Sequence, residues 1–202
     1  MLQLSHIGEI LLSSLITESA DVKKILFDSA FIQNNSIKVI PEIRLDACGS
    51  LIFDGVHKID VSVLDLNNSI CYPIEAKLGL DRLSKNEFEK RFIADCGTSH
   101  QGARVKGSMI SILERRLPVQ CKGHDLTVTY NGQKFIVNDS WSLVCRQPVI
   151  SKWSSTGKPA LSEKCSIISF ESLVRAYGSN NDFNNLMKRL LEKDYYAEWL
   201  TK

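Results

Sequence analysis

The segment from Lys58 to Lys77 constrains the fold more than any other part of the chain. On either side of a polar stretch, Asp65-Leu66-Asn67-Asn68-Ser69, apolar residues alternate with polar or small ones. The first run is KIDVSVL and the second is ICYPIEAK. A period of two is typical of a strand with one buried face, and the polar stretch supplies turn residues, so the sequence predicts a β-hairpin.

The register of this hairpin would bring two acidic residues together. A four-residue loop would pair Asp65 with Ile70. The same register places Asp60 opposite Glu75. Directly opposed residues have Cβ atoms about 4.5–5.5 Å apart, so the two carboxylates would repel one another. Lys77 follows Glu75 by two residues, which puts it on the same face at roughly 7 Å along the strand.

A bound divalent cation would offset this repulsion. Mg²⁺ prefers oxygen ligands and is commonly held by one or two carboxylates together with waters and phosphate oxygens. Phosphodiester hydrolysis uses such a metal, and a second cation can position the attacking water and offset negative charge. Asp60 and Glu75 are therefore candidate Mg²⁺ ligands, and Lys77 is a candidate catalytic residue. The alternative is a structural ion pair, in which Lys77 neutralises Glu75 and Asp60 points into solvent.

Periodicity elsewhere in the chain predicts helices around these strands. Apolar residues at three- and four-residue spacing predict an amphipathic helix over residues 4–16, with Glu9 on or near its polar edge. Further helices are expected over residues 21–31, 99–117, 170–177 and 182–200. Extended segments are expected over residues 37–45, where Pro41 marks an edge or bulge, over 126–144 and over 141–149, and a loop is expected over 151–158.

The layout resembles the PD-(D/E)xK nuclease superfamily, which has the restriction-endonuclease-like fold. The resemblance covers roughly residues 4–117. It implies an α/β fold with a central mixed β-sheet flanked by helices. Residues 118–202 would then form a C-terminal extension of strands and helices, packed on this core within a single domain.

In that family, an acid on the first helix, an Asp on the hairpin and the (D/E)xK tripeptide form the active site. The residues that match the family's functional positions are Glu9, Asp60, Glu75, Lys77 and Gln101. By analogy, the backbone carbonyl of Ala76 would also bind the metal, and Gln101 would lie near the substrate. The chain departs from the family's motif at Ile59, which precedes Asp60 where the motif has Pro.

Other patterns have competing interpretations. Asp21-Val22-Lys23 also fits (D/E)xK, but in a helix these two side chains diverge by about 200° and could not share a metal. Glu9 has the alternative of a solvated residue on a polar helix face. The six cysteines form no CxxC pair and are expected to be reduced and buried. Zinc ligands could come from Cys96, His100, Cys121 and His124, but their spacing matches no common zinc finger.

The charge is distributed unevenly along the chain. Residues 1–77 contain 10 acidic and 6 basic residues, whereas residues 78–202 contain 13 acidic and 19 basic ones. This asymmetry suits a carboxylate site next to a phosphate-binding surface, although ordinary solvated faces would give the same count. The candidate nucleic-acid contacts are Arg104, Lys106, Arg115 and Arg116.

We therefore expect a cytoplasmic, Mg²⁺-dependent nuclease that hydrolyses phosphodiester bonds in DNA, with Mn²⁺ able to replace Mg²⁺. Restriction, phage defence, recombination or repair would all suit this activity, and a homodimer is compatible with it. No small-molecule cofactor is expected, and no membrane association, because no apolar run approaches the roughly 20 residues that cross a bilayer. The alternatives are a catalytically inactive nuclease-fold module that binds nucleic acid or protein, and a different metal-dependent hydrolase that uses the same carboxylates.

Overall fold

The computed structural model describes residues 4–27, 36–53, 57–78, 84–90, 98–156 and 161–192. Its helices are α1 (Leu4–Glu18), α2 (Ala20–Leu26), α4 (Lys85–Phe88), α5 (Met109–Leu113), the 3-10 helix η3 (Val119–Cys121), α6 (Gln147–Thr156), α7 (Phe170–Tyr177) and α8 (Asn180–Glu192). Its strands are β1 (Ile37–Arg44), β2 (Ile52–Phe53), β3 (Lys58–Asp65), β4 (Ile70–Lys77), β5 (Ser99–Gln101), β6 (Arg104–Lys106), β7 (Thr127–Tyr130), β8 (Gln133–Val137), β9 (Trp141–Cys145) and β10 (Cys165–Ser169).

Strands β3 and β4 form the predicted antiparallel hairpin in the predicted register. Asp65 opposes Ile70, and the pairing continues as far as Val61 and Ile74. The buried carboxylate of Asp65 accepts hydrogen bonds from the two asparagine N–H groups of the turn, at 3.0 and 3.1 Å. Asp commonly closes a turn in this way, so its side chain fixes the loop length and with it the register.

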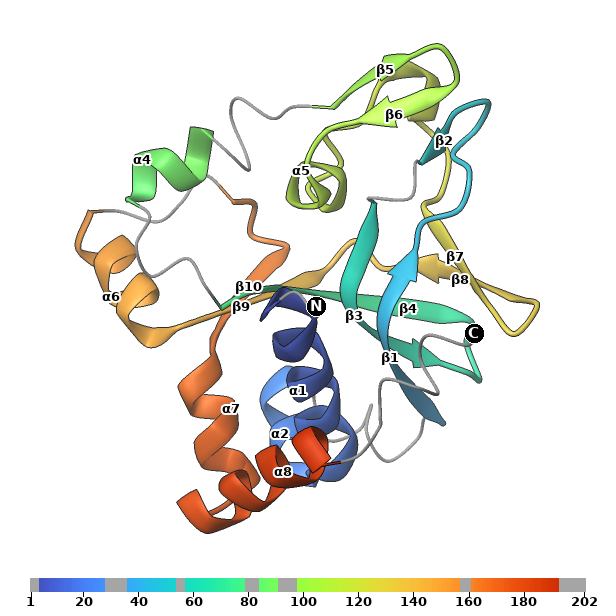
Figure 1. Ribbon diagram of the computed structural model, residues 1–202. Coiled ribbons are helices and arrows are strands. Elements are labelled where there is room, and N and C mark those ends of the chain that lie inside the picture. Colours follow the sequence, from blue (N-terminus) through green and yellow to red (C-terminus); the bar gives the residue numbers. More distant parts are fainter. Residues whose placement is uncertain are drawn as a thin grey trace.

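The hairpin lies in a mixed seven-stranded sheet. The strand order is β1-β3-β4-β8-β7, with antiparallel pairing except between β4 and β8. Strand β9 pairs in parallel with the end of β4, and β10 pairs in parallel with β9 (Figure 1). The fold is therefore α/β with a central mixed sheet, as expected, and strands that follow residue 118 are part of this sheet.

Helices cover the sheet and bury its apolar residues. Helices α1, α2, α7 and α8 lie together (Figure 1), and their apolar residues pack against Val61, Val63 and Ile74 of the hairpin. A second cluster joins the sheet to Phe88 of α4, Ile110 of α5 and residues of α6. Removal of this apolar surface from water stabilises the layers and holds the ends of β3 and β4 in place.

Residues 99–117 differ from the predicted helix. Strands β5 and β6 form a hairpin, β2 pairs beside β6, and only Met109–Leu113 are α-helical. Gly102 and Gly107 have φ values of +58° and +143°, which favour glycine and break a helix. The apolar spacing in this segment fits a helix by coincidence, because buried Val105 belongs to a strand, Met109–Leu113 to α5, and Leu117 to neither.

The other predicted helices and strands are present, but several begin or end at different residues from those predicted. Residues 147–156 form α6 where a strand end and a loop were expected, since Pro148 is favoured in the first turn of a helix. The predicted first strand is β1, at one end of the strand order, which suits Pro41.

Residues 28–31 and 193–200 of the predicted helices, and Cys96, lie outside the described residues. No helix within the described segments is long and apolar enough to cross a membrane.

Candidate active site

The ammonium group of Lys77 contacts three oxygen atoms where β3 begins and β4 ends. Its Nζ lies 2.8 Å from Glu75 Oε2, 3.1 Å from Asp60 Oδ2 and 3.5 Å from the backbone oxygen of Ala76. These three groups are the ones that the sequence predicts to bind a metal. They therefore converge on one positive charge.

Asp60 is held in this arrangement by the backbone of β4. The N–H group of Ala76 donates a hydrogen bond of 2.8 Å to Asp60 Oδ2. This contact agrees with the hairpin register. Val61 pairs with Ile74, so continuing the register by one residue places Asp60 opposite Glu75. The Asp60 side chain is only 17% exposed, so the alternative of an Asp60 that points freely into solvent is wrong.

Glu75 is the most deeply buried member of the site. Its side chain is 1% exposed, and its Oε1 has no hydrogen-bond partner among the described residues. Burial raises the pKa of Glu75 and nearby Asp60 raises it further, while Lys77 lowers it. Burial alone would lower the pKa of Lys77, but the charges of Glu75 and Asp60 raise it above its ordinary value. Burial and the nearby acids therefore make this site favour the uptake of a proton or a cation.

Helix α1 contributes Glu9 to the same site. Glu9 is 8% exposed, which excludes the alternative of a solvated residue on a polar helix face. Burial, followed by the charges of Asp60 and Glu42, raises the pKa of the Glu9 carboxyl from 4.5 to about 8. Its Oε2 has no hydrogen-bond partner in the described part of the chain. Glu9 therefore lies beside Asp60, and a proton or a bound cation would stabilise its carboxyl group there.

Glu42 on β1 is a member of the site that sequence analysis missed. Strand β1 pairs with β3 at Pro41 and at Ile43, the two neighbours of Glu42 in the sequence. This register places Glu42 opposite Asp60. Glu42 lies near Glu9, where its charge and side chain help to raise the pKa of the Glu9 carboxyl. The Oε2 atom of Glu42 also lies 3.0 Å from Lys58 Nζ. The positive φ of Glu42, 47°, is an unusual backbone conformation with no signature in the sequence.

We call Glu9, Glu42, Asp60 and Glu75 the carboxylate cluster. Gln101 is not brought to this cluster by any hydrogen bond of the described residues. It lies exposed at the end of β5, and its side chain accepts a hydrogen bond from Lys106. Its expected role near the substrate depended on a helix that does not form.

The four predicted phosphate contacts divide into two pairs. Arg104 and Lys106 lie exposed on β6. Arg115 is 26% exposed and is paired with Asp139 at 2.8 Å, and it also donates to the backbone oxygen of Val137. Arg116 is exposed after α5. Arg115 is therefore already neutralised, whereas the cations of β6 are open to solvent.

The oxygen donors near Lys77 fit a divalent cation. No three His, Cys, Asp or Glu side chains of the described residues are grouped so as to hold a metal ion. Mg²⁺ needs fewer side chains than this, because waters and phosphate oxygens complete its coordination. Asp60, Glu75 and the carbonyl of Ala76 supply the oxygen atoms that Mg²⁺ prefers, and Glu75 Oε1 is unpartnered among the described residues.

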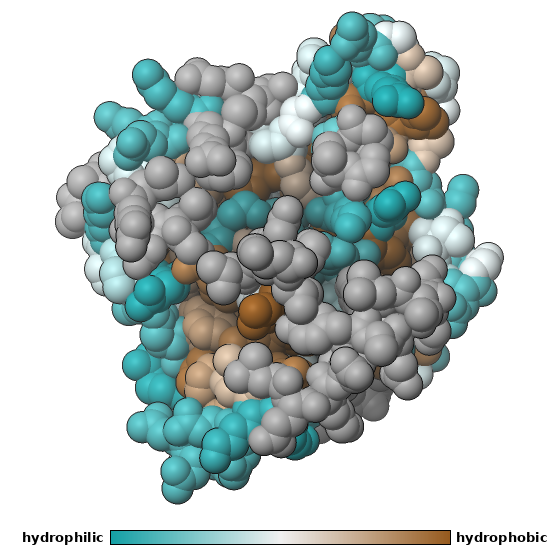
Figure 2. Space-filling view, in the orientation of Figure 1, coloured by the Kyte–Doolittle hydropathy of each residue, from teal (hydrophilic) through white to brown (hydrophobic). Residues whose placement is uncertain are grey.

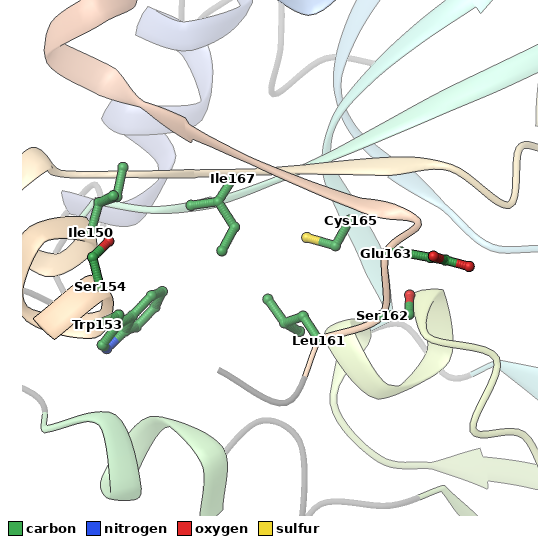
Figure 3. A pocket seen from close by; sticks show the side chains of 8 residues that line it. All are labelled: Ile150, Trp153, Ser154, Leu161, Ser162, Glu163, Cys165 and Ile167. Atoms are coloured by element: carbon green, nitrogen blue, oxygen red, sulfur yellow. The ribbon is translucent and has the colours of Figure 1, made fainter. Parts of the chain in front are cut away.

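A cavity of about 600 Å³ lies apart from this site, between α6 and β10. Figure 3 shows its lining side chains, of which Ile150, Trp153, Leu161 and Ile167 are apolar. No member of the carboxylate cluster lines it. The cavity therefore has no part in the chemistry described above.

Comparison with known proteins does not assign a family to this site. No family model, curated protein or solved structure matches the chain.

Proposed function

We propose that the protein is a Mg²⁺-dependent DNA nuclease of the PD-(D/E)xK superfamily, with a restriction-endonuclease-like core. The observation that carries this proposal is the convergence of Asp60, Glu75 and the Ala76 carbonyl on the Lys77 ammonium. A helix acid, a hairpin Asp and an acid-x-Lys tripeptide on adjacent elements are the arrangement that the superfamily resemblance implies. The buried, unpartnered oxygen of Glu75 adds support, because a phosphoryl-transfer site needs open acceptors for a metal.

Each residue has a role in this proposal. Asp60, Glu75 and the carbonyl of Ala76 would hold Mg²⁺, which when bound polarises the phosphoryl group and acidifies water. Lys77 would leave its present contact with Glu75 to orient the attacking water and offset charge on the scissile phosphate. Glu9 would give up its proton when a cation binds, and its negative charge beside Asp60 would then strengthen cation binding.

A second candidate is a nuclease-fold module that binds nucleic acid or protein without cleavage. The observation that favours it is that Lys77 pairs with both Asp60 and Glu75. In such a module these ion pairs would be purely structural, and a divalent cation would have to compete with an ammonium group already in place. The two candidates differ in their response to metal.

The test is cleavage of plasmid, linear duplex, single-stranded DNA and RNA in the presence of Mg²⁺ or Mn²⁺. Glu75→Gln and Lys77→Ala are assayed beside Glu163→Gln and Lys164→Ala, which make the same changes at exposed positions. We expect the site variants to lose at least a hundredfold in rate and the exposed variants to match the wild type. Equal cleavage by all five proteins would reject the assignment of the site. A metal-unresponsive wild type with no cleavage would favour the inactive module.

A further inference from the structure

The small sheet β2-β6-β5 has one face whose side chains are all exposed and an opposite face that is buried except for His100. Pairing of the three strands puts Ile52 beside Arg104, Arg104 beside Gln101, and Lys106 beside Ser99. All five of these side chains are exposed, whereas Phe53 and Val105 on the opposite face are buried. We call Ile52, Ser99, Gln101, Arg104 and Lys106 the cationic face.

The two cations of this face are not neutralised. Arg104 and Lys106 form no ion pair with a described residue, and Lys106 donates only to the neutral side chain of Gln101. Some other described cations are paired, for example Arg115 with Asp139 and Arg189 with Glu18. The described residues of this sheet include no acid. Figure 2 shows both hydrophilic and hydrophobic residues at the corner of the molecule that this sheet occupies, at the upper right.

The cationic face is joined to the strand that carries Asp60. His57 Nε2 lies 3.0 Å from the backbone oxygen of Gly107, which follows Lys106 directly. Asp60 is three residues beyond His57, or about 10 Å along an extended chain. DNA has a phosphate every 3.4 Å of axis on each strand, so about 10 Å corresponds to about three phosphates. A duplex bound at the carboxylate cluster can therefore reach this face.

We propose that the cationic face binds the phosphate backbone of double-stranded DNA a few nucleotides from the cleaved bond. This inference rests on the proposed function and names its substrate class. Surfaces for single strands combine cations with aromatic side chains on which bases stack. The cationic face has two cations and no aromatic side chain, a composition suited to phosphate contacts on a duplex.

The test compares Arg104→Ala/Lys106→Ala with Arg175→Ala/Lys188→Ala, which removes the same charge from exposed positions on α7 and α8. Binding to a fluorescent duplex and to a single strand of equal length is measured in EDTA, which prevents metal-dependent cleavage, over a range of salt. We expect the first variant to bind the duplex at least about tenfold more weakly. Its salt slope should fall by about 1.8, because each phosphate contact contributes about 0.9. The control should keep both values, and melting curves should show both variants folded.

The outcomes separate this inference from the nuclease assignment. Unchanged duplex affinity and salt slope in Arg104→Ala/Lys106→Ala would overturn the inference even if Mg²⁺-dependent cleavage is observed. A single strand that binds the wild type as tightly as the duplex would overturn it too. Loss of duplex binding in this variant alone, with a wild type that never cleaves, would support the DNA-binding face and reject the nuclease.

Discussion

Lys77 Nζ lies 2.8 Å from Oε2 of Glu75, two residues earlier on the same strand. This contact requires an extended backbone, in which residues two apart lie on one face. The matching triplet Asp21-Val22-Lys23 lies in α2, where Lys23 instead donates to the backbone oxygen of Thr17 and Lys24 pairs with Asp21. The same three-letter pattern thus gives a charge cluster on a strand and ordinary surface contacts on a helix.

Removal of the Lys77 charge should destabilise the protein. Lys77→Met keeps the length of the side chain but leaves Asp60 and Glu75, which are 17% and 1% exposed, without their cation. We expect a loss of about 3–5 kcal/mol in the free energy of unfolding, measured by urea titration without metal. Lys24→Met removes an exposed pair with Asp21 and should cost less than about 1 kcal/mol. Similar losses in the two variants would contradict the buried pairing of Lys77.

Divalent metal should raise the melting temperature of the wild type. A cation that binds only the folded protein contributes about 2.7 kcal/mol at a concentration one hundred times its Kd. Asp60→Asn should abolish most of this gain, whereas Asp139→Asn, at an exposed position paired with Arg115, should leave it intact. Melting curves recorded with EDTA, Mg²⁺ and Mn²⁺ would measure the effect. An Mn²⁺ gain that survives in Asp60→Asn would place the metal elsewhere.

The metal-free protein should become less stable as pH rises. The pKa of Glu9 is raised from 4.5 to about 8 by burial, Asp60 and Glu42, so the folded state favours its protonated form. This contribution to stability is full below pH 4.5 and is lost as pH rises through about 8. In EDTA, the stability of the wild type relative to Glu9→Gln should fall with pH, by at most about 1.4 kcal/mol per unit for one proton. A constant difference between the two proteins from pH 5 to 9 would contradict this cause.

The hairpin and its register could be predicted because both depend on local sequence. Alternation over residues 58–77 set the strands, and the Asp65 turn set the pairing that leads to Asp60 and Glu75. Glu42 could not be found in this way. Its position depends on the pairing of β1 with β3, which are separated in sequence by β2, and on its positive φ.

The structure of the segment around Arg104 was predicted wrongly because two features of its sequence conflict. The spacing of its apolar residues favours a helix, whereas its glycines do not. The apolar residues from Val105 to Leu113 fit helical spacing, while Gly102 and Gly107 require backbone that ends a helix. Tertiary contacts decide between them, since β6 pairs with the distant strand β2. Likewise, nothing local indicates that β9 would pair with the end of β4, next to Lys77.

Two glycines with nearly the same positive φ should respond differently to a methyl group. Gly49 and Gly102 have φ values of +60° and +58°, so alanine at either costs about 1–2 kcal/mol in backbone strain. At Gly49 the added Cβ would also lie 2.8 Å from the backbone oxygen of Gln120 and 2.9 Å from a ring carbon of His124. Gly102 has no such neighbour within 4 Å. Overpacking of this kind costs about 1–3 kcal/mol more, so Gly49→Ala should unfold at lower urea than Gly102→Ala. Equal midpoints would show that residues 118–125 do not pack tightly against the loop that leads from β1 to β2.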